Sequence, residues 1–143
     1  MIVWDDSILT GIANVDRDHK DIVEKINLFL ADIGADASVS VIHDSFRRME
    51  RCIYRHLELE EKMLLAVGYD QTEPHFATHK KLTDDLEGIW DDMLGNTDFH
   101  PGVAATAWLR SWLFDHVRRE DLAYRDWIVA ADKVDLANER MND

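Results

Sequence analysis

Cysteine, basic residues and long apolar runs are scarce in this chain of 143 residues, and each scarcity excludes a class of protein. A single cysteine, Cys52, excludes an internal disulfide and is typical of a reducing compartment. No stretch approaches the roughly 20 apolar residues of a membrane span, and the opening Met-Ile-Val-Trp-Asp-Asp lacks the basic and apolar regions of a secretory signal. With 16 basic and 29 acidic residues, the net charge of −13 argues against nucleic-acid binding. We therefore expect an acidic, cytoplasmic protein that binds neither nucleic acid nor membrane.

Glycine and proline are also few, and they divide the chain into segments of helical period. There are six glycines and two prolines, and between them apolar residues recur at spacings of three and four. We found no segment with the period of two that is typical of a strand. The predicted helices cover about residues 16–33, 40–67, 74–94 and 101–119. An extended arm (residues 1–15) precedes them and a loosely patterned helical segment (about 121–139) follows.

This pattern predicts an all-α fold of one domain over residues 1–143. Four amphipathic helices with short connections favour an antiparallel up-down-up-down four-helix bundle. The N-terminal arm and a short C-terminal helix would complete it.

Ionisable residues interrupt the apolar faces of these helices at core positions. They are His19, His56, Glu60, His75, His79, His116 and Asp121. Burial of such groups costs free energy unless they are paired or bind a metal, and two histidines four residues apart on one face, such as His75 and His79, are a metal-chelating pair. Taken singly, a buried histidine is more often satisfied by a hydrogen bond. Asp121 lies five residues after His116, so it shares that face only if the end of the helix is bent or unwound.

The predicted topology brings all seven groups to one end of the bundle. The start of the first and third helices and the end of the second and fourth lie together there, and at ~1.5 Å per residue the groups would fall within about two turns of one level. Seven ligands exceed the four of a usual zinc site, so we expect two ions. Imidazole outnumbers carboxylate, unlike in ferritin-like di-iron proteins, and it suits iron, zinc, copper and nickel.

A count of coordination positions leaves room for a small ligand. Two six-coordinate irons that share both carboxylates and one bridging oxygen would have eleven of their twelve positions filled. The remaining position could take a diatomic molecule.

The spacing of these residues resembles the hemerythrin family, and specifically its bacteriohemerythrins. The resemblance covers about residues 4–127, and further phrases such as Val15-Asp-Arg-Asp-His19-Lys and Trp112-Leu-Phe-Asp-His116 support it. The matching motif is His19, His56-xxx-Glu60, His75-xxx-His79 and His116-xxxx-Asp121.

The resemblance implies an oxo- or hydroxo-bridged pair of iron ions that binds O2 reversibly, for storage, delivery or sensing. It implies that His75, His79 and His116 hold one iron and that His19 and His56 hold the other. Glu60 and Asp121 would bridge the two.

Apolar residues within one helical turn of the ligands should form the wall of the O2 pocket and exclude water. They are Ile22, Leu57, Leu82, Trp112 and Leu113. Leu57 departs from the family pattern, because members commonly have Phe after the histidine of the second helix. We hypothesise that the smaller side chain opens the pocket and speeds autoxidation.

Other interpretations stay open at this point. The same centre would serve a di-iron redox enzyme that acts on O2, peroxide or nitric oxide, although the few carboxylates weigh against high-valent chemistry. It would also serve a signalling module whose protein partner is unknown. Tyr124, three residues after Asp121, could pack on the bundle end or donate a hydrogen bond near the site.

Overall fold

Helices make up the framework of the protein. The computed structural model describes residues 3–95 and 100–142, so residues 1–2, 96–99 and 143, which include the first two residues of the predicted arm, lie outside it. Within the described ranges there is no strand, which confirms the predicted all-α class. The elements are η1 (Asp6–Ile8), α1 (Ala13–Gly34), α2 (Val39–Val67), α3 (Thr72–Gly95), α4 (Pro101–Arg110), η2 (Ser111–Asp121), α5 (Leu122–Ala130) and α6 (Val134–Arg140).

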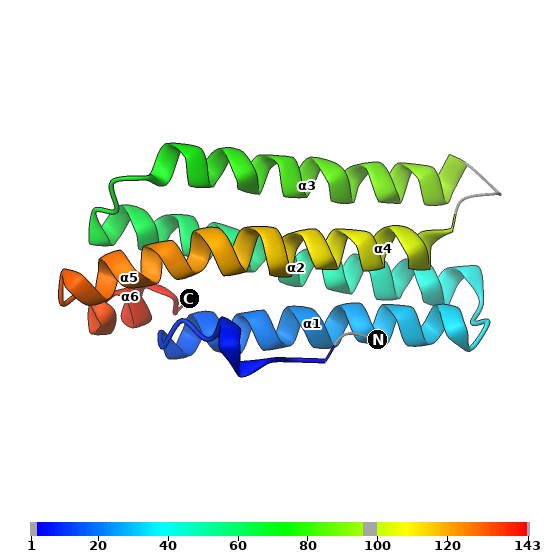
Figure 1. Ribbon diagram of the computed structural model, residues 1–143. Coiled ribbons are helices and arrows are strands. Elements are labelled where there is room, and N and C mark those ends of the chain that lie inside the picture. The colour runs from blue at the N-terminus through cyan, green and yellow to red at the C-terminus, as the bar shows by residue number, and fades with distance from the viewer. Residues whose placement is uncertain (1–2, 96–99, 143) are drawn as a thin grey trace.

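The long helices pack as an antiparallel bundle. Figure 1 shows α1, α2, α3 and the continuous rod α4–η2–α5 side by side, with α5 and α6 at the end where α1 and α3 begin and α2 ends. Local signals set several boundaries: the Ser38 hydroxyl accepts from the Val41 N–H at the start of α2, and Gly68 ends that helix in the left-handed conformation. No helix of the described residues has the length and apolar character needed to cross a bilayer.

Both ends of the chain are more helical than predicted. The arm contains the short 3₁₀ turn η1, which buries Ile8, and α1 begins at Ala13 rather than near residue 16. The Asp16 carboxylate accepts hydrogen bonds from the Thr10 N–H and hydroxyl and the Gly11 N–H, and so fixes the turn from arm to helix. At the other end, the expected single C-terminal helix is two helices, α5 and α6.

A π-helical segment takes the place of the expected bend or unwinding after His116. Over Ser111–Asp121 the turns are wider than in an α-helix, and the Leu122 N–H bonds back to the carbonyl of Val117, five residues earlier. Because a π-helix pairs residues at i and i+5, Asp121 comes one turn after His116 and on the same face. The helix therefore brings Asp121 inward without breaking.

The apolar core has two parts that meet at one level of the bundle. On α2 the first cluster includes Ile53 and Leu57, and the second, which packs beneath α5 and α6, includes Leu59 and Met63. The ionisable residues of α2 thus fall where the two clusters join.

Candidate metal centre

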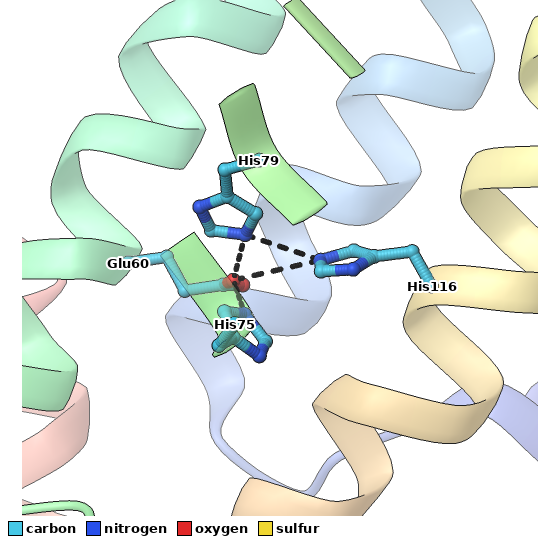
Figure 2. Close-up of side chains that lie close together, drawn as sticks. All are labelled: Glu60, His75, His79 and His116. Atoms are coloured by element: carbon cyan, nitrogen blue, oxygen red, sulfur yellow. Dashed lines mark hydrogen bonds and ion pairs between the residues drawn. The ribbon is translucent and has the colours of Figure 1, made fainter. Parts of the chain in front are cut away.

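Seven ionisable side chains gather in the interior at the end of the bundle shared by α5 and α6. Each is at most 3% exposed, although all seven are histidine, glutamate or aspartate. They come from α1, α2, α3 and η2, four segments far apart in the chain. Figure 2 shows part of the group, with the carboxylate of Glu60 surrounded by three imidazoles.

The two oxygens of Glu60 face different histidines. Its Oε1 lies 2.8 Å from Nε2 of His75 and 2.9 Å from Nε2 of His79. Its Oε2 lies 3.1 Å from Nε2 of His56 and 3.9 Å from Nε2 of His19. A single carboxylate therefore stands between two sets of imidazoles.

The carboxylate of Asp121 divides its neighbours in the same way. Its Oδ1 lies 3.1 Å from Nε2 of His116 and 3.4 Å from Nε2 of His75, while its Oδ2 lies 3.3 Å from Nε2 of His19. The two carboxylates thus define a three-histidine position (His75, His79, His116) and a two-histidine position (His19, His56). Each carboxylate places one of its oxygens at each of these two positions.

These distances suit two metal ions. Ligand atoms about 2.1 Å from a common ion and at right angles to each other are about 3 Å apart. Most of the separations found here are close to that value, and the whole range is 2.8–4.0 Å. The histidines and Glu60 alone form two potential metal-binding groups that share Glu60. Nε2 of His19, Nε2 of His56 and both oxygens of Asp121 are buried without a hydrogen-bond partner. Such atoms are rare in folded proteins and indicate that something else binds them.

Two further carboxylates pair with the outer ring nitrogens (Nδ1) of two of the imidazoles. Nδ1 of His56 pairs with Oδ2 of Asp18 at 3.1 Å, and Nδ1 of His116 pairs with Oε2 of Glu120, whose other oxygen accepts from the Thr78 hydroxyl at 3.0 Å. A proton kept on Nδ1 by a carboxylate leaves the Nε2 lone pair free for a metal and raises its basicity.

These outer carboxylates were not among the site residues predicted from the sequence. A third, Glu61, has Oε2 at 3.5 Å from Nδ1 of His79, and Nδ1 of both His79 and His19 is buried without a hydrogen-bond partner. Asp18, Glu61 and Glu120 each stand next to a predicted ligand in the sequence. That adjacency was the available signal, but spacing alone does not say which imidazole each carboxylate reaches.

The cluster binds protons strongly. Burial would lower the pKa of His19, but Asp121 and Glu60 raise it to about 9. Burial would also lower the pKa of His116, and the same two carboxylates together with Glu120 raise it to about 10. Burial would raise the pKa of Glu60, yet the four histidines around its carboxylate hold it well below its ordinary value. A metal must therefore displace protons from these imidazoles when it binds.

The five predicted wall residues are all buried, and they lie together in the first apolar cluster. They are Ile22, Leu57, Leu82, Trp112 and Leu113. The Trp112 ring meets His19 edge-on, with 5.3 Å between centroids. A groove of about 430 Å³ between α2 and α3 is lined by Leu57 and by His79, so Leu57 lies where that groove meets the buried cluster.

Tyr124 has both of the roles that the sequence left open for it, packing on the bundle end and hydrogen bonding near the site. It is fully buried in the second apolar cluster beneath α5 and α6. Its hydroxyl donates a hydrogen bond of 3.1 Å to Oε2 of Glu60. It therefore packs on the bundle end and also helps to orient the central carboxylate.

The comparisons with known proteins agree on one family. Residues 10–128 match the model of the hemerythrin HHE cation binding domain. A bacteriohemerythrin of Pseudomonas paraeruginosa is 29% identical over 125 residues, which are 87% of this chain and 80% of the relative. A bacteriohemerythrin of Methylococcus capsulatus is 29% identical over 80% of this chain and 86% of its own length, and a hemerythrin-like protein of Naegleria gruberi is 22% identical over 85% and 89%. No solved structure matches the chain significantly.

Proposed function

This chain belongs to the hemerythrin family, and from that premise we propose that it binds O2 reversibly at a non-heme pair of iron ions. The bacteriohemerythrins it resembles cover most of its length. Its buried histidine and glutamate groups suit a centre of two metal ions.

We assign the ligands from the way the carboxylates divide the histidines. One ion would take the three-histidine position and the other the two-histidine position, with Glu60 and Asp121 contributing one oxygen to each. The observation that carries this assignment is that both carboxylates, from different helices, direct their two oxygens to the same two sets of imidazoles.

The two positions differ in ways that favour ligand binding at only one of them. The three-histidine position has one protein ligand more than the two-histidine position, so the latter keeps room for an external molecule. Trp112 packs against His19 at this position, and Ile22 is fully buried one turn further along α1. Two ferrous ions would supply the pair of electrons that O2 takes up on binding.

The surrounding protein restricts the chemistry to a reversible step. The five wall residues are at most 4% exposed, and they would keep bulk water and reductants away from bound O2. Asp18 and Glu120 keep the protons on the outer nitrogens of His56 and His116, so that the inner nitrogens stay available.

An anaerobic reconstitution tests the proposal. Metal-free protein is loaded with ferrous iron, the iron content is measured, and the visible spectrum is recorded before air is admitted, in air, and after O2 is removed. Two irons per chain and a visible band that appears with O2 and bleaches when it is removed support reversible binding. A band that never bleaches, or O2 consumed continuously in the presence of a reductant, contradicts it, and the second result would favour a redox enzyme.

A further inference from the structure

Three oxidisable aromatic side chains form an unbroken row from the buried cluster towards the surface. The Tyr124 ring lies 5.6 Å from the His75 ring, the Tyr69 ring 6.3 Å from Tyr124, and the Trp127 ring 5.6 Å from Tyr69, all as centroid separations. These are separations of rings in contact. Tyr124 is fully buried, whereas Tyr69 and Trp127 are half-buried. The row thus begins at the candidate ligands and ends at solvent.

A second aromatic row leaves the cluster but does not reach the surface. Trp112 meets His19 and stacks on Trp108 with 6.1 Å between centroids. Trp108 is only 5% exposed, and its N–H donates to the carbonyl of Leu82. This second pair therefore ends inside the core, and it provides a comparison for the first row.

The inner end of the first row has a proton acceptor in place. The phenol of Tyr124 gives up an electron readily only if its proton can leave at the same time, and its hydroxyl already donates to Oε2 of Glu60 at 3.1 Å. That distance is short enough for direct proton transfer between the two oxygens.

We propose that Tyr124, Tyr69 and Trp127 form a relay that carries single oxidising equivalents from the buried centre to the surface. The oxidant is hydrogen peroxide that reaches the centre, and the final donor is a small one-electron reductant in solution, such as ascorbate. The relay protects the buried histidines from oxidation, a function separate from O2 binding.

Each transfer is balanced in electrons and protons. Tyr124 gives one electron to the oxidant and its phenolic proton to Glu60. Tyr69 then returns an electron to Tyr124, which takes its proton back from Glu60, and Trp127 replenishes Tyr69, the two outer residues exchanging their protons with water. The reductant restores Trp127. Two such transfers, with two protons from water, convert one hydrogen peroxide to two water molecules.

The relay is testable without metal, because electrons move along the same row in either direction. Metal-free protein is photo-oxidised with a ruthenium polypyridyl complex and persulfate, then freeze-quenched for high-field electron paramagnetic resonance. We expect an early indole radical that is replaced by a hydrogen-bonded tyrosyl radical on Tyr124, and we expect Tyr124→Phe to remove this hydrogen-bonded signal and leave the tyrosyl radical on Tyr69. Tyr69→Phe, which keeps the ring but cannot be oxidised, should leave the radical on the indole. Trp90→Phe, which removes another half-buried indole on α3, is the matched control and should leave the conversion unchanged.

A second measurement uses iron-loaded protein. After treatment with hydrogen peroxide in the absence of reductant, peptide mass spectrometry should find oxidation at Trp127 in the parent protein and at the buried histidines in Tyr69→Phe. Tyr69 and Trp127 are half-buried, so their variants keep the test available if Tyr124→Phe unfolds. A tyrosyl radical that forms equally well in Tyr69→Phe, or an oxidation pattern that this substitution leaves unchanged, would overturn the relay and leave the three rings as packing residues. Neither result depends on reversible O2 binding.

Discussion

Replacement of Asp18 by Asn should weaken one metal position and spare the other. Asp18 is 4% exposed and accepts from Nδ1 of His56. The His56 contact holds the pKa of Asp18 below its ordinary value even though burial would raise it, so the acceptor is an anion. Asn keeps the shape and can still accept the hydrogen bond, but it removes the charge.

The magnitude follows from the strength of the hydrogen bond that changes. A bond to a charged partner contributes about 1.5–3 kcal/mol and a neutral one about 0.5–1.5 kcal/mol. The midpoints of the two ranges differ by about 1.2 kcal/mol, which corresponds to a nearly tenfold loss of affinity. Loss of an outer partner of a metal-bound histidine typically costs about 10–100-fold, so the expectation lies at the lower end of that range.

The assay is a chelator-competition titration of metal-free protein with Zn²⁺, which resolves two binding steps. Asp18→Asn should shift one step by about tenfold and leave the other in place. Glu120→Gln, which acts on His116 at the three-histidine position, should shift the opposite step. Asp21→Asn, an exposed position on the same helix as Asp18, is the matched control. Equal weakening of both steps by Asp18→Asn, or no more effect than in the control, would refute the assignment of His56 to a separate ion.

Three further predictions concern stability and oxidation. The raised pKa values of His19 and His116 stabilise the metal-free protein fully below their unfolded value of 6.5, and this stabilisation is lost as the pH rises through about 9 and about 10. The lowered pKa values of Glu60 and Asp121 have the opposite effect, because they stabilise the folded protein above the unfolded pKa values of these carboxyls. Thermal unfolding without metal should therefore show its highest midpoint between about pH 4.5 and 6.5. A midpoint that rises steadily to pH 9 would contradict this expectation. Leu57→Phe should slow autoxidation of the oxygenated protein, followed as loss of its visible band, and an unchanged rate counts against the hypothesis that Leu57 opens the pocket. Phe29→Ala, at a fully buried position, should cost about 3–5 kcal/mol in urea unfolding, whereas a loss below about 1 kcal/mol would mean that the site is not closely packed.

The fold could be predicted from the sequence because its signals are local and repeated. The period of apolar residues identifies each long helix, and Gly68 and Pro101 lie where a helix ends or begins. The polar residues that interrupt those periods, such as His56 and Glu60, were visible for the same reason. Their convergence followed from the topology of the bundle.

Features that depend on contacts between helices could not be predicted in this way. The π-helical widening that turns Asp121 inward follows no sequence period. Asp18 lies beside His19 in the sequence yet reaches His56 on the neighbouring helix, a pairing set by how α1 and α2 pack. The second C-terminal helix was likewise hidden, because α5 buries only two residues and α6 only one, so both show a weak apolar pattern.

The proposed centre has two ions side by side, with Glu60 and Asp121 between them. Anomalous diffraction at the iron absorption edge, from crystals of the ferrous-loaded protein, would locate both ions. We expect two anomalous peaks, one within the three-histidine position and one within the two-histidine position, with a carboxylate oxygen of both Glu60 and Asp121 next to each. A single peak, or two peaks that do not share these carboxylates, would contradict this arrangement.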